Sequence, residues 1–147
     1  MILGSGGAAR AVSYSLSTSN VRGIKVQGRN NVKVKSLQNW INGLYPKNSN
    51  FTIPDIVINC TPLGMYPNIE DLPIKIDKLG EETILIDTIY NPLETKWLSE
   101  GKKIGLKTIG GLDMFIAQGI VSVEKWFNKK IFDKLDLQAI RKKLRKK

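Results

Sequence analysis

A glycine-rich turn near the start of the chain has the spacing of a phosphate-binding site. Residues 4–9 read GSGGAA and fit the pattern G-x-G-x-x-G/A. In a dinucleotide-binding fold, these glycines allow a tight bend and a close backbone approach, and the following helix points its first N–H groups at a pyrophosphate. An ordinary strand-to-helix connection explains the same residues, so the neighbouring strand ends must decide between the two interpretations.

The end of the next predicted strand favours a phosphorylated cofactor. NAD-binding proteins usually have an acidic residue about 20 residues after the glycine turn, but this chain reads Gln27-Gly28-Arg29-Asn30 there. Arg29 could stack on adenine and pair with a 2′-phosphate, and Lys33 could reach the same phosphate from the following helix. Most exposed cations have no such role, but the position of these two predicts NADP rather than NAD.

Three more residues could line a ligand. Thr61 follows a predicted central strand, at the edge where open α/β sheets bind ligands, although a rigid Pro-Gly turn explains the same segment. Tyr90 and Gln118 offer neutral hydrogen-bonding groups that suit a hydroxylated, anionic substrate. Packing or simple exposure would account for both side chains equally well, and neither is a convincing proton-transfer group at neutral pH.

The composition excludes several kinds of site. The 147 residues suit one domain, with 41% hydrophobic content. The chain has no histidine and one cysteine, Cys60, so it has no Ser-His-Asp triad or intramolecular disulfide, and we predict no metal site. No apolar run approaches the roughly 18–20 residues that span a bilayer, and no signal-peptide layout is present. We therefore expect a cytoplasmic protein without a membrane partner.

The positive charge is concentrated at the C-terminus. Six of the last seven residues are basic, and removing them from the net charge of +10 leaves +4 on residues 1–140. This distribution favours a solvated helix end over a nucleic-acid-binding surface.

Predicted strands and helices alternate along the chain. We expect strands at 1–3, 23–27, 55–60, 83–87 and 103–109. We expect helices at 8–16, 93–101 and 113–127, one that begins at 30 or 31 and ends at about 42, before Gly43, and one that begins at about 133. Residues 62–80 are expected to form a loop. The strands are apolar on both faces, which indicates a parallel sheet covered by helices on each side. The predicted fold is a Rossmann-like, doubly wound α/β fold.

Together the motifs resemble the C-terminal NADP-binding domain of the shikimate dehydrogenase family. The matching blocks follow the order of the family over roughly residues 1–127: GSGGAARAV, GRN with Lys33, DIVINCTPLGM, DTIYNPLETKWL and GGLDMFIAQG. The resemblance implies an NADP-binding domain over residues 1–128, followed by a C-terminal helix with a basic tail over residues 129–147.

The resemblance also implies roles for individual residues. Cofactor contacts would be Gly4, Gly6, Gly7 and Ala8 at the phosphates, Arg29, Asn30 and Lys33 at the 2′-phosphate, Thr61 and Leu63 along the cofactor, and Ile89, Gly111 and Met114 around the nicotinamide. Tyr90 and Gln118 would contact the substrate. The chain departs from the family at Gly28, where Asn is usual, at Lys33, where Arg is common, and at Asp113, where Gly is frequent.

In this family, a substrate-binding domain precedes the glycine turn and supplies a Lys and Asp pair that moves the hydroxyl proton. Nothing in this chain matches the motifs of that pair. We therefore expect a cofactor domain without catalytic residues, from an enzyme of aromatic amino-acid biosynthesis that interconverts 3-dehydroshikimate and shikimate with NADPH. Its expected partners are the substrate, the missing domain and a second copy in a homodimer. The alternatives are an NAD-using quinate/shikimate dehydrogenase and a non-catalytic NADP-binding or interaction module.

Overall fold

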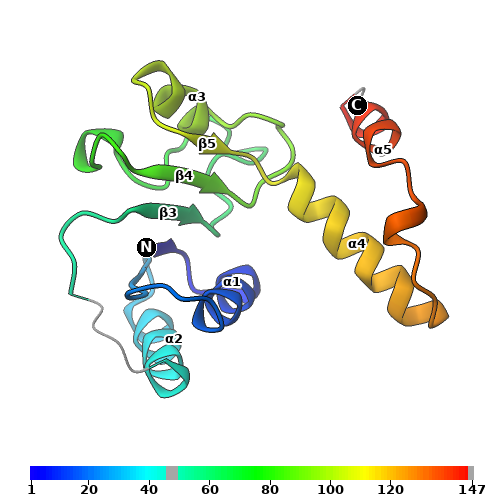
Figure 1. Cartoon of the computed structure of the whole chain (residues 1–147). Coiled ribbons are helices and arrows are strands. Elements are labelled where there is room, and N and C mark those ends of the chain that lie inside the picture. Colours follow the sequence, from blue (N-terminus) through cyan, green and yellow to red (C-terminus); the bar gives the residue numbers. More distant parts are fainter. Residues whose placement is uncertain (46–49, 146–147) are drawn as a thin grey trace.

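Five parallel strands form one sheet in the computed structural model, which describes residues 1–45 and 50–145 (Figure 1). The strands are β1 (Ile2–Leu3), β2 (Val26–Gln27), β3 (Ile56–Asn59), β4 (Ile84–Asp87) and β5 (Thr108–Ile109). Their order is β2-β1-β3-β4-β5, and every neighbouring pair is parallel. The predicted doubly wound α/β fold is confirmed.

The short strand β1 lies inside the sheet rather than at its edge. Ile2 pairs with Val26 on one side and with Ile58 on the other. Because successive side chains of a strand point to opposite faces, Ile2 and Leu3 enter different hydrophobic cores, where they are 0% and 3% exposed. Two residues of β1 thus connect both halves of the core.

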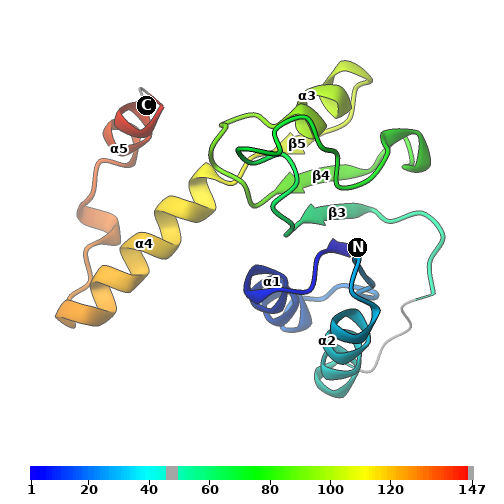
Figure 2. The ribbon, with the colours of Figure 1, turned by 180° about the vertical axis from the view of Figure 1, so that it is seen from behind.

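Helices cover both faces of the sheet (Figures 1 and 2). On one face, α1 (Gly7–Ser17) and α2 (Asn31–Leu44) pack together over a core made of Ile2, Ala9, Ile24, Val26, Leu37 and Ile41. On the other face lie α3 (Lys96–Lys103) and the 3₁₀ turn η1 (Ile76–Lys78), over a core made of Leu3, Val57, Leu85, Trp97, Leu98 and Leu106. The small side chain of Ala9, fully buried, allows α1 to approach β1 closely.

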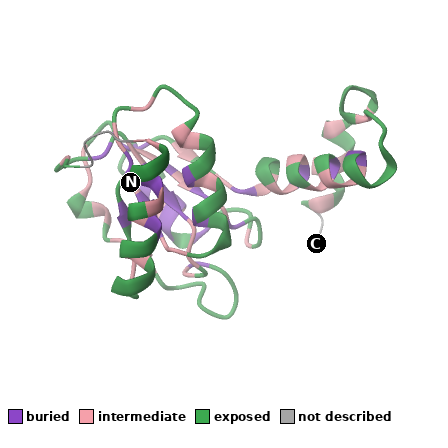
Figure 3. Cartoon of the chain, turned by 90° about the horizontal axis from the view of Figure 1, so that it is seen from below, coloured by how far each residue is buried: buried purple, intermediate pink, exposed green. Residues whose placement is uncertain are grey.

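The last two helices lie apart from the sheet. Helix α4 (Leu112–Phe127) extends away from it, and α5 (Leu137–Leu144) packs beside α4 after the 3₁₀ turn η2 (Phe132–Lys134) (Figures 1 and 3). The buried Glu124 holds this reversal, because its Oε1 accepts hydrogen bonds from the backbone N–H groups of Ile131 and Phe132. These two hydrogen bonds lower the pKa of the Glu124 carboxyl.

An ion pair joins the two ends of this helical hairpin. Arg141 Nε, on α5, lies 2.6 Å from Asp113 Oδ1 in the first turn of α4. The pair gives Asp113 a structural partner, which the sequence alone does not suggest. Of the predicted basic tail, Lys146 and Lys147 lie outside the described residues.

Side-chain caps explain where the observed helices differ from the predicted ones. Helix α3 begins at residue 96 instead of 93, because Thr95 Oγ1 accepts the Leu98 N–H as its N-cap. The final helix begins at 137 instead of 133, where Asp136 caps it through the Ala139 N–H. Helix α2 runs through Gly43, which was expected to end it.

The edge strands β2 and β5 are also shorter than predicted. Each has only two residues. Strand β2 is short because its neighbour β1 offers it only two residues to pair with. Strand β5 is short because the segment before it contains the end of α3 and a turn at Gly105, whose φ is +91°. No helix in residues 1–45 and 50–145 is both long enough and apolar enough to span a membrane.

Candidate functional site

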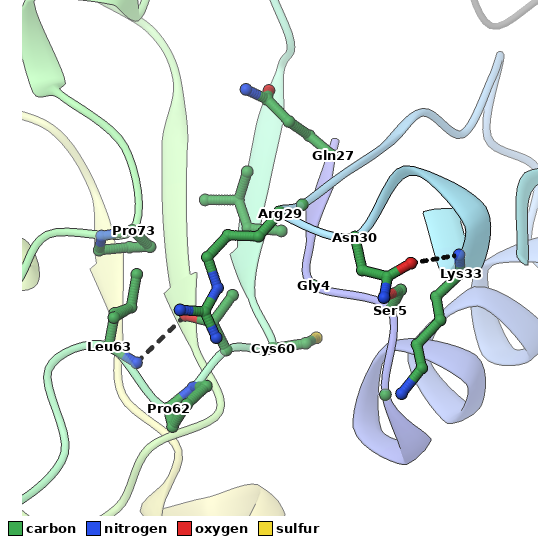
Figure 4. A pocket seen from close by; sticks show the side chains of 14 residues that line it. Gly4, Ser5, Gln27, Arg29, Asn30, Lys33, Cys60, Pro62, Leu63 and Pro73 are labelled. Atoms are coloured by element: carbon green, nitrogen blue, oxygen red, sulfur yellow. Dashed lines mark hydrogen bonds between the residues drawn. The ribbon is translucent and has the colours of Figure 1, made fainter. Parts of the chain in front are cut away.

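A cavity of about 620 Å³ opens at the carboxyl ends of β2, β1 and β3 (Figure 4). The residues around it come from the segments 3–6, 27–30 and 60–63, together with Lys33 and Pro73. Strand β1 is the topological switch point of the sheet, because β2 lies on one side of it and β3 on the other. Ligands of open α/β sheets bind at such a point.

The glycine turn forms the floor of this cavity. Gly4 has φ +105°, and a Cβ there would lie 2.8 Å from the carbonyl oxygen of Cys60. Its N–H donates to Gln27 O at 2.7 Å, and the Cys60 N–H donates to Leu3 O at 2.8 Å, so hydrogen bonds fix the turn to the ends of both neighbouring strands. At Gly6 and Gly7, in contrast, an added Cβ would meet nothing within 4 Å, which leaves the start of α1 open to a ligand.

The predicted phosphate residues divide between two adjoining cavities. Gly4 and Gly6 line the larger one, whereas Gly7 lines a smaller cavity of about 460 Å³ at the first turns of α1 and α2, together with Gly6, Arg10 and Lys33. Ala8 is exposed in the first turn of α1 and lines neither of these two cavities.

Two cations, Arg29 and Lys33, line the main cavity, and none of its lining residues is acidic. Figure 4 shows the Arg29 side chain extending across the cavity toward Pro62 and Leu63. Asn30 also lines the cavity, but its Oδ1 is the N-cap of α2 and accepts the Lys33 N–H at 2.9 Å. Lys33 borders both cavities.

Gly28 packs closely against the glycine turn. A Cβ at this position would lie 3.3 Å from Cγ2 of Val34 and 3.7 Å from the Cα of Gly4. A side chain at position 28 would therefore press on Val34 and lie next to the glycine turn. This close packing suits glycine at position 28.

Thr61 and Leu63 form the wall opposite Arg29, and a residue that sequence reasoning missed holds them there. Asn59 is fully buried at the end of β3, and its Oδ1 accepts both the N–H and the hydroxyl of Thr61. Its Nδ2 donates to Leu63 O and to Asp87 Oδ1. The available signal was a polar residue at the end of each apolar strand, IVIN and ILID.

Asp87 is buried beside Asn59, and its carboxyl has a raised pKa. Burial raises the pKa of its carboxyl, and hydrogen bonds from the Ile89 N–H, the Thr95 hydroxyl and the Asn59 amide oppose that rise. The three donors lie 2.8–3.1 Å from the carboxyl oxygens. Both oxygens of Asp87 therefore have protein partners.

The other predicted residues form a separate group at the end of β4 and the start of α4, and they do not line the main cavity. Gly111 is buried against β4, where a Cβ would lie 2.4 Å from Thr88 O. Tyr90 stacks on Phe115 with ring centroids 3.9 Å apart, and Gln118 Nε2 donates to Phe115 O at 3.0 Å. Ile89 is buried and Met114 is exposed.

Cys60 lines the cavity, yet its thiol is expected to be unreactive. Burial, with a further contribution from the negative charge of Asp87, raises the pKa of the thiol to about 12. A free cysteine has a pKa of about 8.5, and the thiolate is the reactive form. In this region the structure thus offers a neutral thiol rather than a nucleophile.

We expect iodoacetamide to alkylate native Cys60 at pH 8 roughly a thousandfold more slowly than an ordinary thiol, because the thiolate fraction is lower by that order. Mass spectrometry would follow the reaction without ambiguity, since Cys60 is the only cysteine in the chain. The chain unfolded in urea serves as the control and should react at the ordinary rate. Equal rates for the native and unfolded chains would contradict the expected acidity.

Within the described residues, no group of three or more Cys, Asp and Glu side chains is placed to hold a metal ion. Besides backbone groups, the polar groups around the cavity are two cations, the hydroxyls of Ser5 and Thr61, the amides of Gln27 and Asn30, and the thiol of Cys60. Such groups suit an anionic, phosphorylated ligand.

Comparisons with known proteins return shikimate dehydrogenases among the curated relatives. No protein-family model matches the chain. It is 44% identical over 138 residues to the NADP⁺ shikimate dehydrogenase of Methanocaldococcus jannaschii, which covers 86% of this chain and 48% of that protein. It is 40% identical over 134 residues to the corresponding protein of a Geobacillus species, with the same coverage. The chain spans about half the length of the curated relatives it matches.

Solved structures agree with these relatives. A crystal structure of a shikimate dehydrogenase in complex with NADP⁺ has a TM-score of 0.77 and 40% identity, and covers 88% of this chain and 48% of that one. The shikimate 5-dehydrogenase of Listeria monocytogenes, in complex with shikimate and NAD, has a TM-score of 0.80 and 27% identity, and covers 97% of this chain and 54% of that one.

Proposed function

The chain is homologous to the C-terminal half of the shikimate dehydrogenases, and we propose that it is the NADP-binding domain of such an enzyme. The observation that carries this proposal is the cavity at the switch point. Its glycine turn requires glycine at position 4, its charged lining residues are both cations, and no carboxylate lines it. A carboxylate would have favoured the ribose hydroxyls of NAD.

We place the phosphates of the cofactor at the start of α1. The first N–H groups of a helix lack intrahelical partners and attract anions, and Gly6 and Gly7 leave the approach open. Gly4 and Ala8 complete the proposed cradle, Gly4 through the bend and Ala8 through its backbone N–H. In this arrangement the protein binds the phosphates through the oriented backbone N–H dipoles of α1 and supplies no reactive side chain.

We place the adenosine end between β2 and the segment after β3. Arg29 reaches across the cavity toward Leu63, so an adenine ring can stack on its guanidinium while Thr61 and Leu63 line the other side. The 2′-phosphate would then pair with Arg29 and Lys33, close to Asn30 at the start of α2. Lys33 supplies charge without the bidentate geometry of arginine.

The nicotinamide and the substrate belong, in this proposal, to the group at the end of β4. Ile89, Gly111 and Met114 would surround the nicotinamide, and Tyr90 and Gln118 would donate hydrogen bonds to the substrate. NADPH supplies the hydride when bound, and this domain holds and orients it. The Lys and Asp that transfer the proton would come from the half of the relatives that this chain does not match.

The complete enzyme would reduce 3-dehydroshikimate to shikimate. Use of NAD is the second candidate, because the similar Listeria monocytogenes enzyme was solved with shikimate and NAD. The division into a cofactor domain over residues 1–128 and a basic C-terminal helix over residues 129–147 stays a prediction, as do the homodimer and the position in the cytoplasm.

Calorimetric titration of the purified chain with NADPH, and in parallel with NADH at the same salt concentration, tests the proposal. We expect binding of both with a preference for NADPH, and no shikimate-dependent reduction of NADP⁺ by the chain alone. A preference for NADH would support the second candidate. Absence of binding by a folded chain would refute both, and turnover at an ordinary enzymatic rate would refute the proposed division of labour.

A further inference from the structure

We propose that Asn59 is a positioning residue for the cofactor: anchored on Asp87, its amide holds residues 61–63 in the shape that faces Arg29 across the cavity. This inference rests on the proposed function, because it assumes that NADP occupies the cavity. The inference goes beyond the proposed function, because it attributes part of the cofactor affinity to Asn59, a side chain that does not line the cavity.

The amide of Asn59 has no hydrogen-bonding capacity left over. A primary amide has two N–H donors and two acceptor lone pairs. Oδ1 accepts from Thr61 N at 3.0 Å and from Thr61 Oγ1 at 2.7 Å, while Nδ2 donates to Leu63 O and to Asp87 Oδ1, each at 3.1 Å. Asparagine alone fits this pattern at this length, since aspartate lacks the donors and leucine lacks all four groups.

The anchor of this amide is rigid because two elements fix it. Asn59 and Asp87 face each other in the register of β3 and β4 and are 0% and 1% exposed. Asp87 Oδ1 also accepts the Ile89 N–H at 3.0 Å, and its Oδ2 accepts the Thr95 hydroxyl at 2.8 Å, at the cap of α3. The same carboxyl therefore fixes the cavity wall and the start of the segment that holds Ile89.

The hydrogen bonds of Asn59 order the cavity wall at residues 61–63 before a ligand binds. Leu63 N donates to Thr61 Oγ1 at 3.2 Å, the dashed line at Leu63 in Figure 4. Together with the hydrogen bonds of Asn59 to Thr61 and Leu63, it closes a ring. A wall that is ordered before binding avoids the entropy loss of being ordered by the ligand. Without Asn59, the ligand itself would have to order the segment opposite Arg29.

The test compares NADP⁺ dissociation constants of the wild-type chain, Asn59→Asp and Thr83→Val. Asn59→Asp preserves shape, removes both donors and places a second carboxyl beside Asp87. Thr83→Val is the matched control, because Thr83 is a buried hydroxyl at the opposite end of β4 that donates to Pro54 O and accepts the Gly80 N–H. We expect Asn59→Asp to weaken binding at least tenfold, and Thr83→Val to lower the melting temperature without changing the dissociation constant.

Amide hydrogen exchange gives a local measurement that general destabilisation would not reproduce. In folded Asn59→Asp, the carboxylate still accepts the Thr61 N–H, but the donor to the Leu63 carbonyl is lost. The Leu63 amide should therefore lose protection in this variant, whereas it should keep it in Thr83→Val. If folded Asn59→Asp binds NADP⁺ within twofold of the wild type, the inference is wrong and the proposed function stands. If the folded wild-type chain binds neither cofactor, the proposed function fails and the inference fails with it.

A second pair of variants applies if Asn59→Asp does not fold. Thr61→Val keeps the γ-methyl group but loses the hydroxyl that links Asn59 to Leu63, and Thr61→Ser keeps that hydroxyl. We expect weaker NADP⁺ binding and a less protected Leu63 amide in Thr61→Val than in Thr61→Ser. Equal affinity of these two variants would overturn the inference.

Discussion

Replacing Gly4 with alanine is expected to abolish NADPH binding and to lower the free energy of unfolding by about 2–4 kcal/mol. Two independent effects combine at this position. The backbone has φ +105°, which side-chain-bearing residues rarely adopt, and the new Cβ would lie 2.8 Å from the carbonyl oxygen of Cys60. Because that oxygen belongs to the backbone after β3, relief of the contact must separate β1 from β3 at the floor of the cavity.

Urea unfolding and NADPH titration would measure the two effects, and Gly43→Ala is the matched control. Gly43 lies within α2, and a Cβ there would meet nothing within 4 Å. Both variants restrict the unfolded chain equally, so their difference reports the folded state. We expect Gly43→Ala to be more stable by about 0.5–1 kcal/mol and to bind normally. Normal NADPH binding by Gly4→Ala would contradict the assignment of the phosphate turn.

Local sequence signals predicted most of the fold and the entrance of the site. Apolar strands that alternate with amphipathic helices gave the parallel sheet, and the glycine spacing located the turn between β1 and α1. The second helix was expected to begin at residue 30 or 31, and Asn30 caps it through the Lys33 N–H. Each of these features depends on residues within a few positions of one another, which is why the sequence alone could predict them.

The features that could not be predicted depend on contacts between distant residues. Asn59 and Asp87 are 28 positions apart and meet only through the register of β3 and β4. Asp113 finds Arg141 across a helical hairpin, also 28 positions away. The sequence presents these as single polar residues, and only the fold determines which of them lie together. The strand-end positions of Asn59 and Asp87 were visible, but their partners were not.

Arg29 is expected to determine the preference for NADPH over NADH. In Arg29→Ala, NADPH binding should weaken about 10- to 100-fold, because charge-assisted hydrogen bonds to a phosphate contribute roughly 1.5–3 kcal/mol. NADH lacks the 2′-phosphate and should lose only the smaller stacking contribution of the guanidinium. The expected result is therefore a change in the ratio of the two dissociation constants, measured by calorimetry at one salt concentration.

Two further variants separate geometry from charge. Arg22→Ala removes the same charge from a side chain that is 91% exposed and pairs with Asp55 at the surface, so it should leave both affinities unchanged. Arg29→Lys retains the charge but loses the planar, bidentate guanidinium, so its NADPH affinity should lie between those of the wild type and Arg29→Ala. An equal loss of NADPH and NADH affinity in Arg29→Ala would mean that Arg29 contacts only the adenosine that both cofactors share. Lys33, which borders both cavities at the start of α2, would then be the residue that contacts the 2′-phosphate.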